Sequence, residues 1–140
     1  MYFIANWKMH GNTRDIERSK SIINLSKQIK YKKHKIIYCP PYTLLKTFYE
    51  KVKGSRVDIG AQNFHSNLSS GPYTGHINSK LIKLAGAKFV IIGHSENREQ
   101  GDTNLDINNK IKAAIKENLN VIFCIGEKLI DKKKTYLLNS

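Results

Sequence analysis

The sequence predicts an α/β fold in which short parallel strands alternate with helices. Five apolar runs rich in β-branched residues recur along the chain, and the stretches between them carry helical patterns. The predicted strands cover residues 2–5, 35–39, 57–61, 89–93 and 120–125. Their starts are separated by 33, 22, 32 and 31 residues, a spacing typical of repeated strand–helix units joined by right-handed crossovers.

The first predicted helix covers residues 13–29. Asn12 and Thr13 are candidate N-caps, and Asp15 and Glu17 suit the positive end of the helix dipole. Apolar positions including Ile29 form one side of this predicted helix.

Three more helices are predicted farther along the chain. The helix at 42–53 follows two prolines and ends at Gly54, and the shorter one at 78–85 ends at Gly86. The helix at 103–118 is expected to bury one apolar stripe. That stripe consists of Ile107, Ile111, Ala114 and Ile115.

The alternating order permits either a doubly wound open sheet or a barrel of eight strand–helix units. The strands are almost continuously apolar, as expected when both faces of a parallel sheet are covered. A length of 140 residues favours the open sheet, because an eight-unit barrel typically needs about 250 residues. Since the composition does not change along the chain, we expect one domain over residues 1–140.

The net charge of +13 raises the question of a nucleic-acid partner. Of the 24 basic residues, 20 are Lys and only 4 are Arg, which is the residue that base and phosphate recognition favours. The dense basic run at 30–35 lies between two predicted elements, where a solvated turn is expected. The pattern therefore favours a solvated basic surface, and a nucleic-acid site stays the less favoured alternative.

The composition also limits the location and the cofactors. No apolar run approaches the roughly 20 residues that a bilayer requires, so a membrane partner is not expected. The first ten residues lack the pattern of a signal peptide. Cys39 and Cys124 lie far apart, which predicts neither a disulfide nor a metal site. We expect a cytoplasmic protein without a cofactor.

Chemically useful side chains cluster just after two of the strands, where sites are built in α/β proteins. Asn6 and Lys8 follow the first strand, and Lys8 can supply a fixed positive charge to an anionic substrate. His94, Ser95 and Glu96 follow the fourth strand. If a short helix begins at Ser95, its dipole favours the neutral form of His94, which can polarise a carbonyl. A capped helix with a structural histidine is the alternative.

Six motifs in register resemble the N-terminal part of triosephosphate isomerase. They lie at 6–9 (Asn-Trp-Lys-Met), 39–45 (Cys-Pro-Pro-Tyr-Thr-Leu-Leu), 60–63 (Gly-Ala-Gln-Asn), 71–75 (Gly-Pro-Tyr-Thr-Gly), 86–96 (from Gly86 to Glu96) and 124–127 (Cys-Ile-Gly-Glu). The resemblance implies an incomplete (β/α)8 TIM barrel of about five parallel strands with helices outside. It also implies the interconversion of dihydroxyacetone phosphate and D-glyceraldehyde 3-phosphate through an enediol(ate).

The resemblance also implies a role for each rim residue. Asn6 and Lys8 would bind the triose phosphate, and Lys8 would place its charge near the phosphate and the developing oxyanion. His94 would be the neutral electrophile, since this family is the known case of a histidine kept neutral by a helix N-terminus. Glu96 would pair with Lys8, and Ser95 would support His94.

A homodimer is expected for the complete family protein. The loop at 64–75 resembles the one that inserts into the partner subunit, with Thr74 and Gly75 at its tip. Two departures concern this contact, because His76 stands where the family usually has an acidic residue and Asn97 where it has Arg. Both charges of an intersubunit salt bridge are thereby replaced, so a contact there leaves no unpaired buried charge. His10 also replaces a usual Asn.

The resemblance places the catalytic carboxylate base after the sixth strand, on the segment before the lid, whereas this sequence supplies five strands. The 140 residues are therefore expected to be inactive alone, as a truncated product or a partial sequence. Two alternatives stay open: a half-enzyme that needs a complementary fragment, and a non-catalytic basic binding module.

Overall fold

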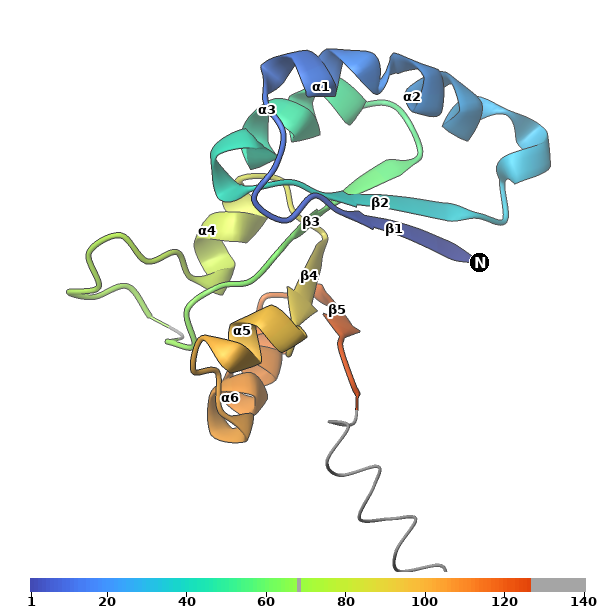
Figure 1. Cartoon of the computed structure of the whole chain (residues 1–140). Coiled ribbons are helices and arrows are strands. Elements are labelled where there is room, and N and C mark those ends of the chain that lie inside the picture. Colours follow the sequence, from blue (N-terminus) through green and yellow to red (C-terminus); the bar gives the residue numbers. More distant parts are fainter. Residues whose placement is uncertain (68, 127–140) are drawn as a thin grey trace, which may run out of the picture.

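The computed structural model describes residues 1–67 and 69–126. Five strands form one sheet, and each pairs in parallel with the next along the chain (Figure 1). They are β1 (Tyr2–Asn6), β2 (Lys35–Cys39), β3 (Val57–Ala61), β4 (Phe89–Ile92) and β5 (Asn120–Phe123). The spatial order β1-β2-β3-β4-β5 confirms the incomplete barrel, in which every crossover moves one strand in the same direction. The open doubly wound sheet that the chain length favoured is wrong, because that fold requires the strand order to reverse.

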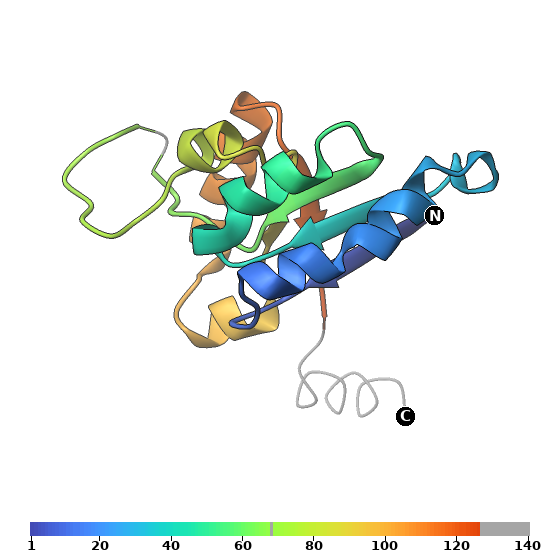
Figure 2. The same ribbon diagram turned by 90° about the horizontal axis from the view of Figure 1, so that it is seen from above.

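Helices follow all of the first four strands. They are α1 (Thr13–Arg18), α2 (Lys20–Lys27), α3 (Tyr42–Val52), α4 (Ser79–Leu84), α5 (Ser95–Glu99) and α6 (Asn104–Lys116), with a 3-10 turn η1 (Ile29–Tyr31). Helix α3 packs on β3, α6 packs on β4 and β5, and α1 lies beside α3 (Figure 2). Among the described helices, none is long and apolar enough to cross a bilayer.

The helix predicted over 13–29 is two helices, and the single-helix prediction is wrong. Asn12 caps α1 through a capping box with Asp15, as the local sequence indicated. Ser19 then ends α1 and starts α2, and its hydroxyl donates to the carbonyl of Ile16 at 2.6 Å. Such a bond competes with the backbone and interrupts helices. Because α2 ends at Lys27, Ile29 lies in η1 and is exposed.

Helix α6 also departs from the predicted apolar stripe. Thr103 caps it through a capping box with Asp106, and Ile107 and Ala114 are buried as predicted. Ile115, by contrast, is 63% exposed, whereas Lys110 is buried. Tertiary contacts of Lys110 with polar groups outside the helix therefore override the hydropathy pattern.

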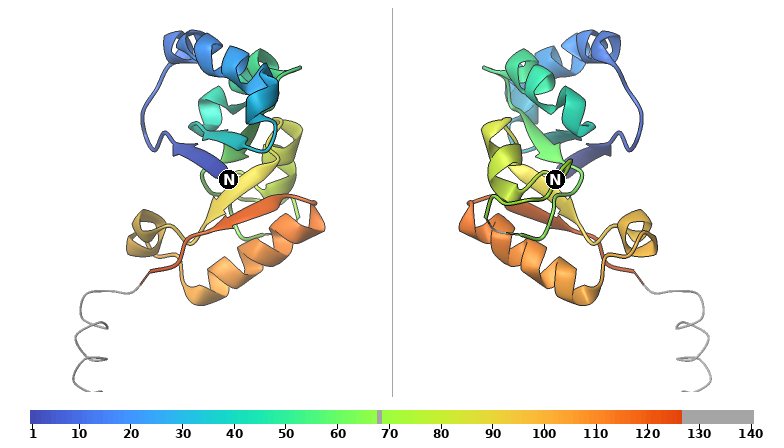
Figure 3. Two further views of the ribbon diagram at one scale, coloured as in Figure 1. Left: turned by 90° about the vertical axis from the view of Figure 1, so that its right-hand side faces the viewer. Right: turned by 90° about the vertical axis from the view of Figure 1, so that its left-hand side faces the viewer.

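The sheet is curled (Figure 3), and a hydrophobic cluster lies on each of its faces. The larger cluster fills the space between the sheet and the helices, with Phe48 of α3 fully buried at its centre. The smaller cluster consists of Ile37, Cys39 and Ile91, packed with Phe89, Ile122 and Cys124. We call this smaller cluster the inner-face cluster. Cys39 and Cys124 are both free thiols.

Two sequence predictions reach residues that the structure does not describe. Glu127, the last residue of the 124–127 motif, lies outside the described residues, as does Leu68 of the 64–75 loop. The fifth strand ends at Phe123, two residues earlier than predicted.

Candidate active site

The candidate site lies at the edge of the sheet where the carboxyl ends of the strands meet. Asn6 is the last residue of β1, and His94 follows β4 after a one-residue turn at Gly93. Because all five strands are parallel, these ends share one rim of the half-barrel. Residues 88 positions apart in sequence are thereby brought into contact.

Lys8 adopts a strained backbone conformation on this rim. Its φ of +52° lies in the left-handed region, which costs a residue with a side chain roughly 1–2 kcal/mol. The Lys8 N–H donates to the side-chain oxygen of Asn6 at 2.9 Å. Strain of this kind persists only where surrounding contacts enforce it, and it concentrates at functional sites.

The ammonium of Lys8 reaches the carboxylate of Glu96 on α5. Lys8 Nζ lies 2.6 Å from Glu96 Oε1, and both side chains are about half exposed. The hydrogen bond from Lys8 is the main reason that the pKa of Glu96 lies below its usual value. The charge of Lys8 lowers the pKa of Glu96 further, and desolvation opposes this lowering. The ion pair therefore holds the Lys8 ammonium at the rim while the ammonium stays accessible to solvent.

His94 is the N-cap of α5, as the sequence predicted. Its Nδ1 accepts a hydrogen bond from the backbone N–H of Glu96 at 3.3 Å. A nitrogen that accepts this bond carries no proton, so the neutral ring holds its proton on Nε2. His94 then presents an N–H donor on the side of the ring away from the helix. Nδ1 also lies 3.6 Å from Glu96 Oε2.

The turn between β4 and α5 is held by two residues for which the sequence predicted no role, Gly93 and Arg98. Gly93 has a φ of +77°, which favours glycine. Arg98 of α5 donates from Nε to the carbonyl of Gly93 at 2.9 Å, and from Nη1 to Asn104 at the same distance. These bonds set the direction in which His94 leaves the strand.

Gln62 is a third residue without a predicted role, although it lies in the 60–63 motif. Its Nε2 donates at 2.8 Å to the carbonyl of Lys8 and at 2.8 Å to the carbonyl of Cys39. No signal in the local sequence reveals this, because the partners lie on other strands.

The structure brings four of the predicted site residues together and leaves the others apart. Asn6, Lys8, His94 and Glu96 form one connected group. Ser95 is exposed at the first position of α5, and within the described residues its side chain makes no hydrogen bond to His94. Thr74 and Gly75 are exposed on the loop between β3 and α4, which projects away from the sheet (Figure 1).

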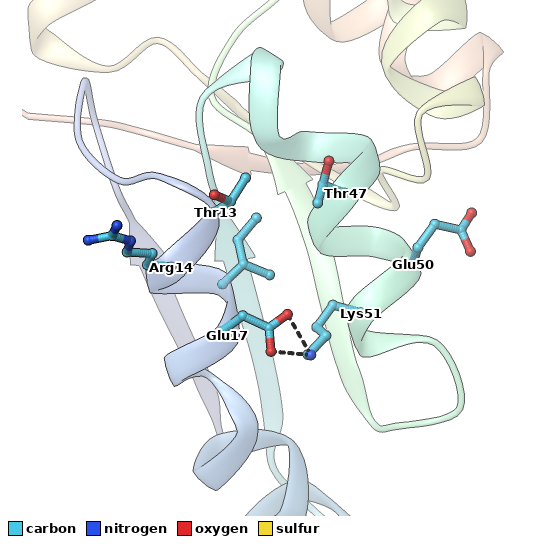
Figure 4. Close-up of a pocket in the computed structure, with 7 residues that line it drawn as sticks. Thr13, Arg14, Glu17, Thr47, Glu50 and Lys51 are labelled. Carbon is cyan, nitrogen blue, oxygen red and sulfur yellow. Dashed lines mark hydrogen bonds and ion pairs between the residues drawn. The ribbon is translucent and has the colours of Figure 1, made fainter.

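A separate pocket of about 430 Å³ lies between α1 and α3 (Figure 4). Two of its charged groups pair with each other: Lys51 Nζ lies 2.7 and 2.6 Å from the two carboxylate oxygens of Glu17. The pKa of Glu17 is lowered, first of all by this hydrogen bond. The pocket thus contains an ion pair that joins two outer helices, and it is separate from the rim residues.

Comparisons with known proteins agree with this geometry. The family model for triosephosphate isomerase matches residues 1–139. The triosephosphate isomerase of Alkaliphilus oremlandii is 39% identical over 134 residues, which cover 92% of this chain and 51% of that protein. That of Clostridium botulinum strain Loch Maree is 40% identical over 126 residues, covering 89% of this chain and 50% of that protein.

A solved structure gives the same result. The crystal structure of triosephosphate isomerase from Bartonella henselae superimposes with a TM-score of 0.86 at 32% identity, covering 99% of this chain and 56% of that one. The chain therefore spans about half the length of the relatives it matches. With a family model that matches nearly every residue and the family fold in its half-barrel, the chain belongs to the triosephosphate isomerase family.

Proposed function

We propose that this chain is the electrophile-bearing half of a triosephosphate isomerase, which interconverts dihydroxyacetone phosphate and D-glyceraldehyde 3-phosphate through an enediol(ate). The observation that carries the proposal is the rim group in which Lys8 contacts Glu96 while His94 caps α5 beside them. This group combines a fixed cation and a neutral N–H donor on one edge of the sheet. These are the features that enolisation of an anionic carbonyl substrate needs.

Each side chain has a role in this proposal. Lys8 attracts the phosphate and offsets the charge that develops on the substrate oxygen, and Asn6 supplies an adjacent amide. His94 Nε2–H donates to the substrate oxygens as the proton moves between the carbons. Glu96 keeps the Lys8 ammonium in place. The reaction needs a base and an electrophile, and no cofactor.

The base is proposed to come from the half of the family protein that this chain does not match. The resemblance places the carboxylate base and the lid there, so we expect no turnover from the 140 residues alone. Without the lid, water reaches the enediolate and favours loss of phosphate. The working unit in this proposal combines both halves in a single cytoplasmic barrel domain.

A homodimer is part of the same proposal. The exposed Thr74 and Gly75, on a loop that projects from the sheet, support insertion into a second copy. Aromatic contacts join the two sides of this loop, since the His65 ring lies 4.5 Å from that of His76 and 4.9 Å from that of Tyr73 between centroids, both pairs being tilted. His76 therefore has a structural partner in its own chain, although it replaces the family's acidic residue.

The test is a coupled assay of isomerisation with the 140-residue chain, with the C-terminal half of the Alkaliphilus oremlandii relative, and with a mixture of the two. We expect no activity above background from either part, and measurable activity from the mixture. General acid–base catalysis contributes typically 10²–10⁴-fold, so the loss should be clear.

The matched control is the same mixture with His94→Ala, which should lose most of the restored activity, compared with His34→Ala, which should not. Robust turnover by the chain alone would show that a carboxylate within these residues serves as the base. A mixture that binds substrate and stays inactive would contradict the proposed division of labour.

A further inference from the structure

Lys8 lies just beyond the end of β1 and does not pair with β2, so its backbone N–H and carbonyl need other hydrogen-bond partners. With a φ of +52° it cannot continue the strand ladder, whose last bond here runs from the N–H of Trp7 to the carbonyl of Cys39 at 3.0 Å. Backbone groups that lack partners are costly. Both polar groups of Lys8 are in fact satisfied by side chains: the N–H by Asn6 at 2.9 Å and the carbonyl by Gln62 at 2.8 Å.

Gln62 reaches Lys8 across an intervening strand. It follows β3, whereas Lys8 follows β1, and the two strands are separated in the sheet by β2. The carboxamide nitrogen carries two hydrogens, and both are used: one on the carbonyl of Lys8 and one on the carbonyl of Cys39, the last residue of β2. A single side chain thus connects the ends of three neighbouring strands at the rim.

We propose that Gln62 is a positioning residue that holds Lys8 in its left-handed conformation, so that the Lys8 ammonium meets Glu96. Its significance for catalysis rests on the function proposed above, but the positioning itself is a property of this chain. An amide of this length is required, since the side chain must donate twice in one direction. The shorter amide of Gln62→Asn would not span β2, and the carboxylate of Gln62→Glu would face two carbonyl oxygens without a hydrogen to donate.

The pKa of Glu96 reports the contact directly. The pKa of Glu96 is lowered first of all by the hydrogen bond from Lys8, and desolvation opposes this lowering. His94 stays unchanged in every variant, so a change in the titration reports on Lys8. Because the folded pKa is depressed, the contact stabilises the chain above the usual glutamate pKa, and this stabilisation is lost as the pH falls through the folded value.

The experiment is a titration of the Glu96 side-chain carbon by NMR in the 140-residue chain. Gln62→Met keeps the length of the side chain and removes both donors, and Lys8→Met removes the ammonium. We expect each to raise the pKa of Glu96, and we expect the double variant to equal Lys8→Met alone. Gln28→Met, which changes a glutamine remote from the rim, should leave the titration unchanged.

A purely structural role for Gln62 makes a different prediction. In that case Gln62→Met lowers the melting temperature but leaves the Glu96 titration at its original position, and the proposal is overturned. The same result follows if Gln62→Met still shifts Glu96 in the Lys8→Met background, since the effect would not pass through Lys8.

A measurement on the unchanged chain protects the test against a variant that fails to fold. Scalar coupling across the hydrogen bonds should connect Gln62 Nε2 with the carbonyl carbons of Lys8 and Cys39, and an absent coupling to Lys8 contradicts the proposal. Failure of the proposed isomerase function is distinguishable. An inactive mixture of halves with a Gln62-dependent Glu96 titration rejects the function and leaves the positioning intact.

Discussion

Two residues on the rim depend on backbone conformations that few side chains tolerate. Lys8 has a φ of +52° and Gly93 has a φ of +77°. At Lys8 the strain falls on a residue whose side chain contacts Glu96, and side-chain amides bind its backbone. At Gly93 a side chain is excluded: an added Cβ would lie 3.1 Å from the ring of Phe123 and 3.2 Å from the carbonyl oxygen of Cys124. Strained backbone therefore follows both β1 and β4 on the rim, and at Gly93, where β4 turns toward α5, it coincides with crowding.

Gly54 provides a matched comparison for the effect of crowding at Gly93. It has the same φ of +77°, but nothing lies within 4 Å of an added Cβ. Gly54→Ala should therefore lower the free energy of unfolding by about 1–2 kcal/mol, the cost of the left-handed conformation. Gly93→Ala should lose about 1–3 kcal/mol more, because the packed neighbours must also move. Urea unfolding of both variants measures this, and equal losses would contradict the role of crowding.

At the scale of elements, one buried cation connects three segments of the fold. Lys110 of α6 is 5% exposed. Its Nζ lies 2.6 Å from both carboxylate oxygens of Asp102, before the helix, and 3.0 Å from Asn63, after β3. The position where α6 meets the rim is therefore fixed by a polar network rather than by the apolar stripe alone.

Lys110→Met tests this network. Removing one partner of a buried pair typically costs about 3–5 kcal/mol, because the remaining charge is left without compensation. The matched control is Lys46→Met, since Lys46 contacts Glu50 at 2.7 Å on the exposed face of α3. An exposed pair of this kind contributes little, because solvent screens its charges. Thermal unfolding of the two variants should differ clearly, and similar midpoints would show that the Lys110 network adds little.

At the scale of the whole molecule, two free thiols on the inner face of the half-barrel differ in exposure: Cys39 is buried and Cys124 is partly exposed. Cys39 is fully buried, and burial raises its pKa to about 12. Cys124 packs at the edge of the inner-face cluster and is partly exposed. Burial raises the pKa of Cys124 as well, while Arg98 opposes that rise. The two thiols therefore report separately on the core and on the surface where the other half of a barrel would close.

Alkylation by iodoacetamide at pH 8 should modify Cys124 and spare Cys39 in the folded chain. Adding the C-terminal half of the Alkaliphilus oremlandii relative should slow the reaction of Cys124, because closure of the barrel covers the inner face. Mass spectrometry locates the modified cysteine, and unchanged Cys124 reactivity in the mixture contradicts closure.

Cys39 also predicts a pH dependence. Above the ordinary thiol pKa, the free energy of unfolding should fall as the pH rises, since the unfolded chain ionises Cys39 and the folded chain does not.

The local sequence predicted the five strands as apolar runs and most of the helices. The cap at Asn12 and the histidine at the start of α5 depend on contacts within one turn of the chain, so they could be predicted locally. The motifs added the order of the strands, which the chain length alone would have assigned to an open sheet. Ser19 shows the limit, because its hydroxyl interrupts a helix whose hydropathy pattern continues.

The sequence alone was enough to predict most of the elements and to place Asn6, Lys8, His94 and Glu96 on one rim. How these residues are held follows from the tertiary structure. Gln62 crosses β2 to hold Lys8, Arg98 holds the turn at Gly93, and Lys110 is buried instead of Ile115. The physical reason is that these contacts join residues whose separation in space is set by the curl and the register of the sheet. Local propensity carries no information about the curl or the register.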